Sequence, residues 1–386
     1  MEEVFKTING FTKLREMRKK RVSVVNTNLE IKSNNNTALS YMDELFHPDG
    51  ANGVFQCEKS VNEKKLRIYN LHIDKKIVLK LGGVIEESWE YIGDCYPQWM
   101  GLYKKYKYDS YTAYMELNDT NDSTAHFILE NEEEMYIISS IGTYDYKTLC
   151  RIVREIGVRK LESEGYIVFH ASMVDFDGNG VLVIGNSGSG KTTLALSLCK
   201  HEGGRFVAND RVMVKVMPDG TFAAIPFSFP ARLNFGTLTT LGLEDKYEDW
   251  KLRIPRPNND SDWDSFNGNK KMHILPMELE KIMNITTCAF SRPIAVVMPS
   301  FAKDNECCGI FAETDRDVLT SNCYTPYDPH FVDDWMVQRE VSLEWLQHTS
   351  DMTVERLLEI TNLKMRYTFD KYADLRKEVI HRVRML

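Results

Sequence analysis

The feature of this sequence that most constrains its fold is a glycine-rich run, Gly185–Thr192. It reads Gly-Asn-Ser-Gly-Ser-Gly-Lys-Thr and fits the pattern G-x-x-x-x-G-K-[ST]. The apolar residues Val181–Ile184 come directly before it and predict a buried strand, while Thr193–Lys200 after it predicts a helix. A strand, a tight turn and a helix in this order predict an α/β fold with a phosphate-binding (Walker A) loop.

The residue types in this run suit a phosphate. Glycines let the backbone approach an anion closely, and amide groups at the start of a helix favour negative charge. Lys191 would reach the β- and γ-phosphates, and the Thr192 hydroxyl would bind Mg²⁺. We therefore expect ATP, or another purine nucleoside triphosphate, with Mg²⁺. The expected nucleotide contacts are Gly185, Asn186, Ser187, Gly188, Ser189, Gly190, Lys191, Thr192 and Thr193.

Polar side chains also follow two neighbouring apolar segments. His170 comes after Tyr166–Phe169, and Asp210 comes shortly after Arg205–Ala208. Ligands gather outside the ends of strands in α/β sheets, so we expect both side chains beside the loop. A carboxylate there can bind Mg²⁺ or accept a hydroxyl proton, and a histidine can orient it. The predicted catalytic residues are Asp210, His170 and Lys191, and the predicted metal ligands are Thr192 and Asp210.

The glycine-rich run leaves the reaction open. An ATP-binding-cassette ATPase would also carry an L-S-G-G-Q-type sequence downstream, and a small GTPase would carry N-K-x-D. Neither follows Thr192 in this chain. Phosphoryl transfer to a bound acceptor is the reaction that remains.

Three segments in a fixed order resemble the HPr kinase/phosphorylase family and the wider group of kinases with a phosphoenolpyruvate-carboxykinase-like core. They are His170–Val174, Gly178–Leu196 and Val207–Val212. The resemblance implies a P-loop kinase core with a mixed sheet. It also implies nucleotide contact at Lys191, metal contact at Thr192, and a reacting centre at His170 and Asn209-Asp210. The implied chemistry is phosphorylation of a serine hydroxyl on a protein or peptide.

The chain departs from the family at three places. The family usually has two adjacent acids where this chain has Asn209-Asp210, so Asp210 alone would bind the metal and accept the proton. Thr193 stands where HPr kinases proper have Glu, and the downstream glycine- and arginine-rich phosphorylase signature is not found. We therefore do not expect reverse phosphorylase activity or HPr as the acceptor.

The expected acceptor is a peptide or protein with a Ser or Thr hydroxyl. Some diverged relatives, including lasso-peptide kinases, phosphorylate a serine of a precursor peptide. Two alternatives remain open. One is a kinase for an amino acid, sugar or antibiotic on the same core, and the other is a non-catalytic nucleotide sensor, to which Asn209 points.

Composition bounds the remaining classes. The 386 residues predict about two domains, and the net charge of −8 argues against nucleic-acid binding through bulk electrostatics. No apolar window of about 18 residues and no signal peptide are found, so we expect no membrane span and a cytoplasmic location. The eight cysteines form no C-x-x-C pair and are expected to be free thiols. Because HPr kinases assemble as oligomers, a homo-oligomer is a further expectation.

The predicted domains are an N-terminal arm, partly helical (1–60), an α+β domain (61–145) and the P-loop kinase domain (146–386). The basic run Lys13–Arg21 in the arm predicts a solvated helix face or a flexible arm. Alternating apolar residues predict strands at Leu66–Ile73 and Ile77–Leu81. Apolar residues at helical spacing predict helices at 146–164, 352–363 and 371–384.

Several weaker candidates lie downstream. The stretch Pro255–Lys271 is polar and predicts a long mobile loop, which could bring cations to a γ-phosphate or an acidic acceptor. An EF-hand at Asp260–Lys271 is rejected, because Ser and Lys occupy its glycine and glutamate positions. The cationic candidates are Lys270, Lys271 and His273 at the loop end, with Arg232 and Arg292 weaker.

Overall fold

The computed structural model describes residues 2–14, 17–24, 27–46, 64–95, 103–116, 126–140, 146–227, 229–243, 272–302, 307–327 and 339–386. It is a mixed α/β structure that divides into two compact units. Unit 1 comprises Met1–Asp43, Val54–Ser163 and Tyr327–Glu340, and unit 2 comprises Glu44–Gly53, Glu164–Pro326 and Val341–Leu386. No helix in the described ranges is long and apolar enough to cross a membrane.

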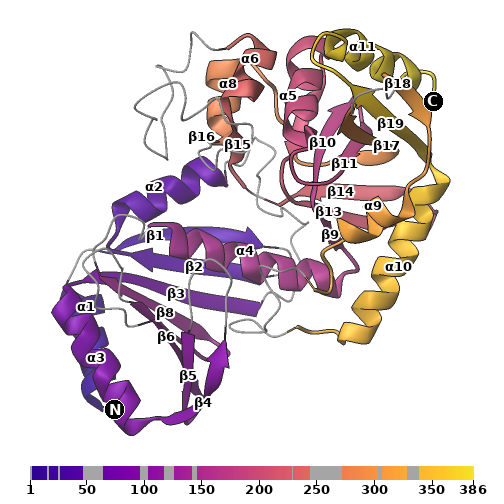
Figure 1. The fold of residues 1–386 in the computed structure, drawn as a ribbon. Coiled ribbons are helices and arrows are strands. Elements are labelled where there is room, and N and C mark those ends of the chain that lie inside the picture. The colour runs from indigo at the N-terminus through magenta and orange to yellow at the C-terminus, as the bar shows by residue number, and fades with distance from the viewer. Residues whose placement is uncertain are drawn as a thin grey trace. The chain divides into compact units, whose positions relative to one another are not determined.

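Unit 1 is built on an eight-stranded mixed sheet with the order β1-β2-β3-β8-β7-β6-β5-β4. Helices α1 (Glu2–Leu14) and α3 (Lys75–Ser88) pack on one face, through a core that joins Val4, Val78 and Ile85 to Leu71 of the sheet (Figure 1). Among the described residues, this unit also contains α4 (Tyr146–Ser163) and most of α2 (Asn36–Leu45), whose last two residues are grouped with unit 2. The strands are β1 (Arg18–Val24), β2 (Thr27–Ser33), β3 (Lys64–Ile73), β4 (Glu90–Cys95), β5 (Tyr103–Tyr108), β6 (Tyr111–Glu116), β7 (His126–Glu130) and β8 (Glu134–Ser140).

Unit 2 contains a six-stranded mixed sheet with the order β12-β10-β11-β17-β19-β18, in which β11, β17 and β19 run parallel. A three-stranded sheet (β14-β13-β9) and a two-stranded sheet (β15-β16) complete it. The strands are β9 (Ile167–Phe169), β10 (Ala171–Phe176), β11 (Asn179–Ile184), β12 (Arg205–Ala208), β13 (Val212–Val216), β14 (Phe222–Pro226), β15 (Ala231–Leu233), β16 (Met272–Ile274), β17 (Arg292–Phe301), β18 (Gly309–Ala312) and β19 (Thr361–Tyr367). The helices are α5 (Lys191–Glu202), α6 (Phe235–Leu241), α8 (Pro276–Met283), α9 (Arg316–Ser321), α10 (Leu343–Glu359) and α11 (Tyr372–Val383).

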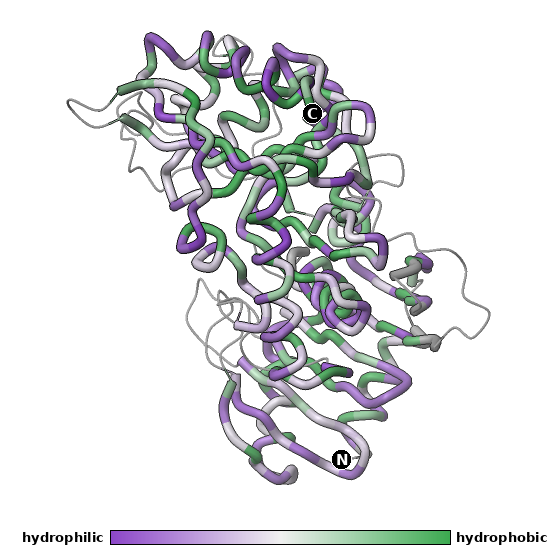
Figure 2. The backbone as a smooth tube through the Cα atoms, turned by 90° about the vertical axis from the view of Figure 1, so that its right-hand side faces the viewer, coloured by the Kyte–Doolittle hydropathy of each residue, from purple (hydrophilic) through white to green (hydrophobic). Residues whose placement is uncertain are grey.

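The six-stranded sheet is buried on both faces, which explains the unbroken apolar run before the glycines. Val181 and Val183 of β11 face a core shared with α5 and α11. Leu182 and Ile184 face the opposite core, which contains β9, β13 and α10. Strands covered on both faces carry continuous apolar sequence rather than alternation. In Figure 2, hydrophobic segments, drawn in green, run through the interior of the part of the backbone that carries the C-terminus.

The structure confirms the strand at 66–73 as part of β3 and the helix at 146–164 as α4. The strand predicted at 77–81 is wrong, because this segment lies in α3. Its buried residues Val78, Leu81, Gly82 and Ile85 have helical spacing, and Asp74 caps the first turn by accepting from Lys76 N at 2.8 Å. The alternating segment that predicted a strand was too short to distinguish the two-residue period of a strand from the 3.6-residue period of a helix.

Two other predictions need correction. The helix predicted at 352–363 is displaced, because α10 ends at Glu359 and Thr361–Tyr367 forms β19 inside the large sheet. The basic run Lys13–Arg21 was predicted as a solvated helix face or a flexible arm, but its second half lies in a strand, because Arg18–Val24 forms β1.

The contacts within the structure group the elements differently from the predicted domains. Helices α1 and α4 and strands β1 and β2 belong with β3–β8 in unit 1, whereas the predicted boundaries divided these elements among three domains.

A buried aspartate fixes the turn between β10 and β11. Asp175 accepts hydrogen bonds from Gly178 N at 3.1 Å, from Ser291 Oγ at 2.5 Å and from Arg205 Nε at 2.9 Å. Removing one partner of a buried, charged network leaves the others unsatisfied. We predict that Asp175→Ala lowers the free energy of unfolding by about 3 kcal/mol. Thermal denaturation followed by circular dichroism measures this, with Asp177→Asn in the same turn, exposed, as the control. Equal melting of both variants and wild type would contradict the role of Asp175.

Candidate functional site

The glycine-rich loop links the end of β11 to the start of α5. Gly188 and Gly190 have φ of +79° and +94°, a region that favours glycine. A Cβ atom on Gly190 would collide with the hydroxyl of Tyr367. The first hydrogen bond of α5 runs from Leu194 N to Gly190 O at 2.8 Å, so the preceding amides lie at the open end of the helix. The loop therefore has the backbone geometry of an anion site.

Side chains and backbone of the loop hold it in shape. Ser189 N donates to Asn186 O at 3.1 Å, which closes a turn. The Tyr367 hydroxyl, at the end of β19, donates to Ser189 O at 3.1 Å. Burial raises the pKa of Tyr367, which keeps this donor protonated. The Ser189 hydroxyl is buried and has no hydrogen-bond partner among the described residues.

Lys191 lies inside the loop. Lys191 is only 8% exposed, and its Nζ donates to Gly185 O at 2.5 Å and to Asn186 O at 3.1 Å. The positive charge is thus already held where the sequence pattern places phosphate oxygens.

Asn209 connects the start of α5 to two strands. Its Oδ1 accepts a hydrogen bond from Thr192 Oγ1 at 2.7 Å and another from Ser172 Oγ at 3.0 Å. Asn209 is buried and follows β12, which pairs with β10 and not directly with β11. Because Thr192 donates its proton to Asn209, the lone pairs of its hydroxyl oxygen remain available to a cation.

Asp210, His170 and Arg211 form a cluster next to Asn209. Asp210 has φ of +69°, an uncommon value for a residue other than glycine. Its carboxylate lies 3.6 Å from His170 Nδ1 and 3.3 Å from Arg211 Nη1. Arg211 Nη1 is also 3.0 Å from Asp210 O and 3.2 Å from His170 Nδ1. The sequence-predicted pair, His170 and Asp210, is therefore brought together.

The histidine is held neutral. Burial is the main cause that lowers the pKa of His170 from 6.5 to about 4, and the charge of Lys191 lowers it further. Asp210 acts in the opposite direction. A guanidinium can only donate, so its contact with Nδ1 favours the tautomer with the ring proton on Nε2. The competing 3.1 Å contact of Nδ1 with Asp210 O would need the other tautomer.

Tyr324 supports this cluster and was missed from sequence. Its ring stacks on His170 with centroids 5.4 Å apart and planes at 14°, and the Arg211 guanidinium lies 4.4 Å from its centroid. Tyr324 N donates to Val168 O at 2.8 Å, which ties the tyrosine to β9. No motif marks Tyr324, because it meets the other residues only through the fold.

Other predicted residues lie elsewhere. Thr193 Oγ1 is 2.9 Å from Thr237 Oγ1 of α6, so its hydroxyl faces that helix. Arg292 starts β17 at the end that pairs with Asn179, opposite the end from which the loop leaves β11, so its predicted phosphate contact is wrong. Arg232 is exposed in β15. His273 lies in β16, and its side chain, like Lys270, Lys271 and the stretch Pro255–Lys271, falls outside the described residues.

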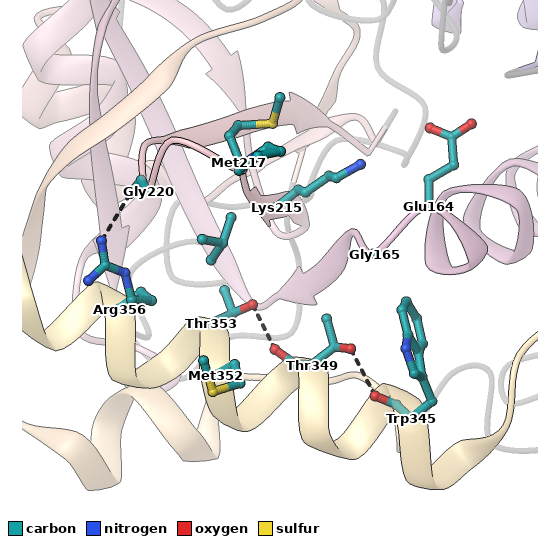
Figure 3. A pocket seen from close by; sticks show the side chains of 12 residues that line it. Glu164, Gly165, Lys215, Met217, Gly220, Trp345, Thr349, Met352, Thr353 and Arg356 are labelled. Carbon is teal, nitrogen blue, oxygen red and sulfur yellow. Dashed lines mark hydrogen bonds between the residues drawn. The ribbon is translucent and has the colours of Figure 1, made fainter.

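A separate hollow of about 470 Å³ lies at the far end of β13 (Figure 3). Trp345, Thr349, Met352 and Arg356 line it from one stripe of α10. The hydroxyls of Thr349 and Thr353 bond back to helix carbonyls at 2.8 Å, which leaves their methyl groups to the hollow. Arg211 precedes the opposite end of β13, so this hollow is not part of the loop site.

Comparisons with known proteins find similarity in the segment that contains the glycine-rich loop. Residues 163–227 match the family described as the HPr Serine kinase C-terminal domain. An HPr kinase/phosphorylase from Prosthecochloris aestuarii is 53% identical over 49 residues, which are 13% of this chain and 14% of that protein. An HPr kinase/phosphorylase from Lachnoclostridium phytofermentans is 42% identical over 62 residues, 16% of this chain and 20% of that protein.

A solved structure, the Hpr(Ser) kinase/phosphatase from Coxiella burnetii, aligns with 56% of this chain and 97% of its own, at 12% identity and a TM-score of 0.28. The chain thus spans about a fifth or less of the length of the curated relatives it matches. The sequence matches confirm the resemblance: residues 163–227, which carry His170, the loop and Asp210, are HPr-kinase-like.

Replacing Gly190 tests the loop geometry. We predict that Gly190→Ala weakens MgATP binding at least about tenfold, because the new Cβ meets Tyr367 and the φ is unfavourable. Gly203→Ala, at the other end of α5, is a matched control, since its φ is +78° and nothing lies within 4 Å of its Cβ. Calorimetry should show binding partly restored by Tyr367→Phe in the Gly190→Ala background. Wild-type affinity in Gly190→Ala would contradict the geometry.

The neutral state of His170 predicts a pH dependence of stability. Between pH 4 and 6.5 the unfolded chain binds a proton at this histidine and the folded chain does not, so stability rises with pH. The part of the free energy of unfolding that depends on a neutral His170 is fully present above pH 6.5. It is lost as pH falls toward 4, because the unfolded chain is then stabilised by protonation. We expect the stability difference between wild type and His170→Gln to change by about 2–3 kcal/mol across this window in urea unfolding. A difference that is independent of pH would mean that His170 is not held neutral.

Proposed function

Because the chain is HPr-kinase-like over residues 163–227, we propose that it is an ATP-dependent kinase that phosphorylates a Ser or Thr hydroxyl of a peptide or protein. The observation that carries this proposal is the Thr192–Asn209 hydrogen bond of 2.7 Å. It joins the start of α5, where phosphates would bind, to the segment that presents Asp210 and its neighbour His170. This connection supports a site in which the proposed nucleotide-binding groups adjoin the proposed proton acceptor.

The loop residues fit a magnesium nucleotide. Lys191 and the first amides of α5 would hold the phosphates, and the buried Ser189 hydroxyl offers an unsatisfied polar group beneath them. No cluster of three His, Cys, Asp or Glu residues suited to a metal occurs in the described ranges. Mg²⁺ commonly takes only one or two protein carboxylates plus phosphate oxygens and water, so Thr192 and Asp210 suffice as its candidate ligands. When bound, Mg²⁺ would neutralise charge on the transferred phosphoryl group.

Asp210 is the proposed base. Arg211 Nη1 lies 3.3 Å from its Oδ2. An Asp carboxylate can accept the proton of an acceptor hydroxyl. The neutral His170 beside it adds no positive charge to the site, and its Nε2–H can donate a hydrogen bond. Asn209 cannot act as a base, because a carboxamide is neutral and does not take up a proton near neutral pH. Its Oδ1 accepts hydrogen bonds from the hydroxyls of Thr192 and Ser172.

The relatives suggest the chemical class of the phosphoryl acceptor, a protein, but do not identify it. The matched proteins are named HPr kinase/phosphorylase, so HPr is one candidate protein acceptor. The missing phosphorylase signature and Asn209 favour a diverged acceptor, such as a serine of a precursor peptide. We propose a cytoplasmic enzyme, and a homo-oligomer by analogy with HPr kinases.

A non-catalytic nucleotide sensor is the second candidate function. Asn209 favours it, because the residue that contacts Thr192 is an amide where the family usually has an acid. In a sensor, MgATP would bind without transfer of the phosphoryl group.

The kinase proposal predicts transfer of labelled phosphate from γ-³²P-ATP to HPr or to a serine peptide encoded nearby. Lys191→Ala should abolish transfer, and Asp210→Asn should reduce kcat by several orders of magnitude while ATP binding persists. Both can be measured by autoradiography of the acceptor. Asn209→Asp separates the alternatives: a large gain in transfer indicates a weakened enzyme. ATP binding without any transfer in wild type or Asn209→Asp would overturn the kinase and leave the sensor.

A further inference from the structure

Two exposed aromatic rings lie at the edge of the sheet where the glycine-rich loop begins. Phe301 ends β17 and is 48% exposed, and Phe369 follows β19 and is 57% exposed. Strands β11, β17 and β19 run parallel, so Ile184, Phe301 and Tyr367 lie at the ends of their strands on the same edge of the sheet. Ligands in α/β folds bind outside the carboxyl ends of parallel strands.

Direct contacts connect these rings to the loop. The Phe301 ring lies 5.6 Å from the Tyr367 ring at 81°, and 5.1 Å from the Phe369 ring at 56°. The Tyr367 hydroxyl donates to Ser189 O at 3.1 Å. On the other side, a Cβ on Gly185 would lie 3.4 Å from Pro299 O, two residues before Phe301. The aromatic pair therefore borders the phosphate loop, separated from it by one tyrosine.

We propose that Phe301 and Phe369 form the binding platform for the nucleobase of the nucleotide held by the loop. This inference rests on the proposed function. Exposed aromatic side chains that adjoin one another often mark a binding site, since folding alone would bury them. The base must lie within the length of one nucleotide from the loop, and these rings border it. Their exposed faces offer a purine the π-surface on which bases stack.

The chemistry of the platform predicts its selectivity. Stacking on aromatic rings tolerates any base, because every base has a π-face, whereas discrimination needs directed hydrogen bonds. The contacts that join Phe301 to Tyr367 and Phe369 are between rings. Stacking on the platform should therefore not distinguish adenine from guanine, and replacing Phe301 or Phe369 should change ATP and GTP binding to the same extent.

The test compares nucleotides with a ligand that lacks the base. Calorimetry would measure magnesium complexes of ATP, GTP and inorganic tripolyphosphate with wild type, Phe301→Leu, Phe369→Leu and the double variant. Each single variant should weaken ATP and GTP binding about tenfold, and the double variant more, with tripolyphosphate affinity unchanged. Phe290→Leu is the matched control, because Phe290 is 46% exposed but precedes the opposite end of β17.

The outcomes separate the two proposals. ATP affinity unchanged in the double variant would overturn the platform while leaving the proposed function standing. Equal weakening of ATP and tripolyphosphate would also overturn it, because the rings would then support the loop through Tyr367 and not the base. If wild type bound tripolyphosphate and ATP equally tightly, no base site would exist. If wild type bound none of the three, the proposed function would fail, and the platform with it.

Discussion

The site depends on one buried amide oxygen. Asn209 Oδ1 accepts the hydroxyl protons of Thr192 and Ser172, and so ties the first turn of α5 to the segment after β12 and to β10. These bonds set the orientation of the Thr192 hydroxyl, and Asp210 is the next residue along the chain. An acid at position 209 could accept the same two bonds but would add a negative charge next to the proposed metal ligands. With Asn209 the chain retains both hydrogen bonds, and Asp210 is the acidic residue of this pair.

The second constraint is the parallel ladder of β11, β17 and β19. It brings together residues from three distant parts of the chain: the loop after Ile184, Phe301 at the end of β17 and Tyr367 at the end of β19. Tyr367 has the central position, because it holds Ser189 through its hydroxyl and contacts Phe301 through its ring. The phosphate end and the proposed base end of one nucleotide thus depend on the same strand order.

Sequence alone could predict the parts of this site that are local. The glycine pattern with its flanking strand and helix needs only neighbouring residues, and His170 and Asp210 follow strands that the apolar runs revealed. Tyr324 and Tyr367 could not be found in this way, because they reach the site only through sheet pairing and a loop that returns to β9. The same limit explains why the helix predicted at 352–363 runs into the start of β19. Leu363, Met365 and Tyr367 are buried in a strand because β17 and β18 flank it. Local periodicity also misassigned 77–81, where burial against the sheet selects a helix.

We propose that Thr192, oriented by Asn209, binds the magnesium of a nucleotide. Calorimetric titration of ATP into wild type and Thr192→Val, each with and without Mg²⁺, tests it most directly, since valine keeps the shape and removes the hydroxyl. Mg²⁺ should strengthen ATP binding in wild type, Thr192→Val should lose most of this gain, and both proteins should bind magnesium-free ATP equally. The same magnesium-dependent gain in both proteins would contradict it.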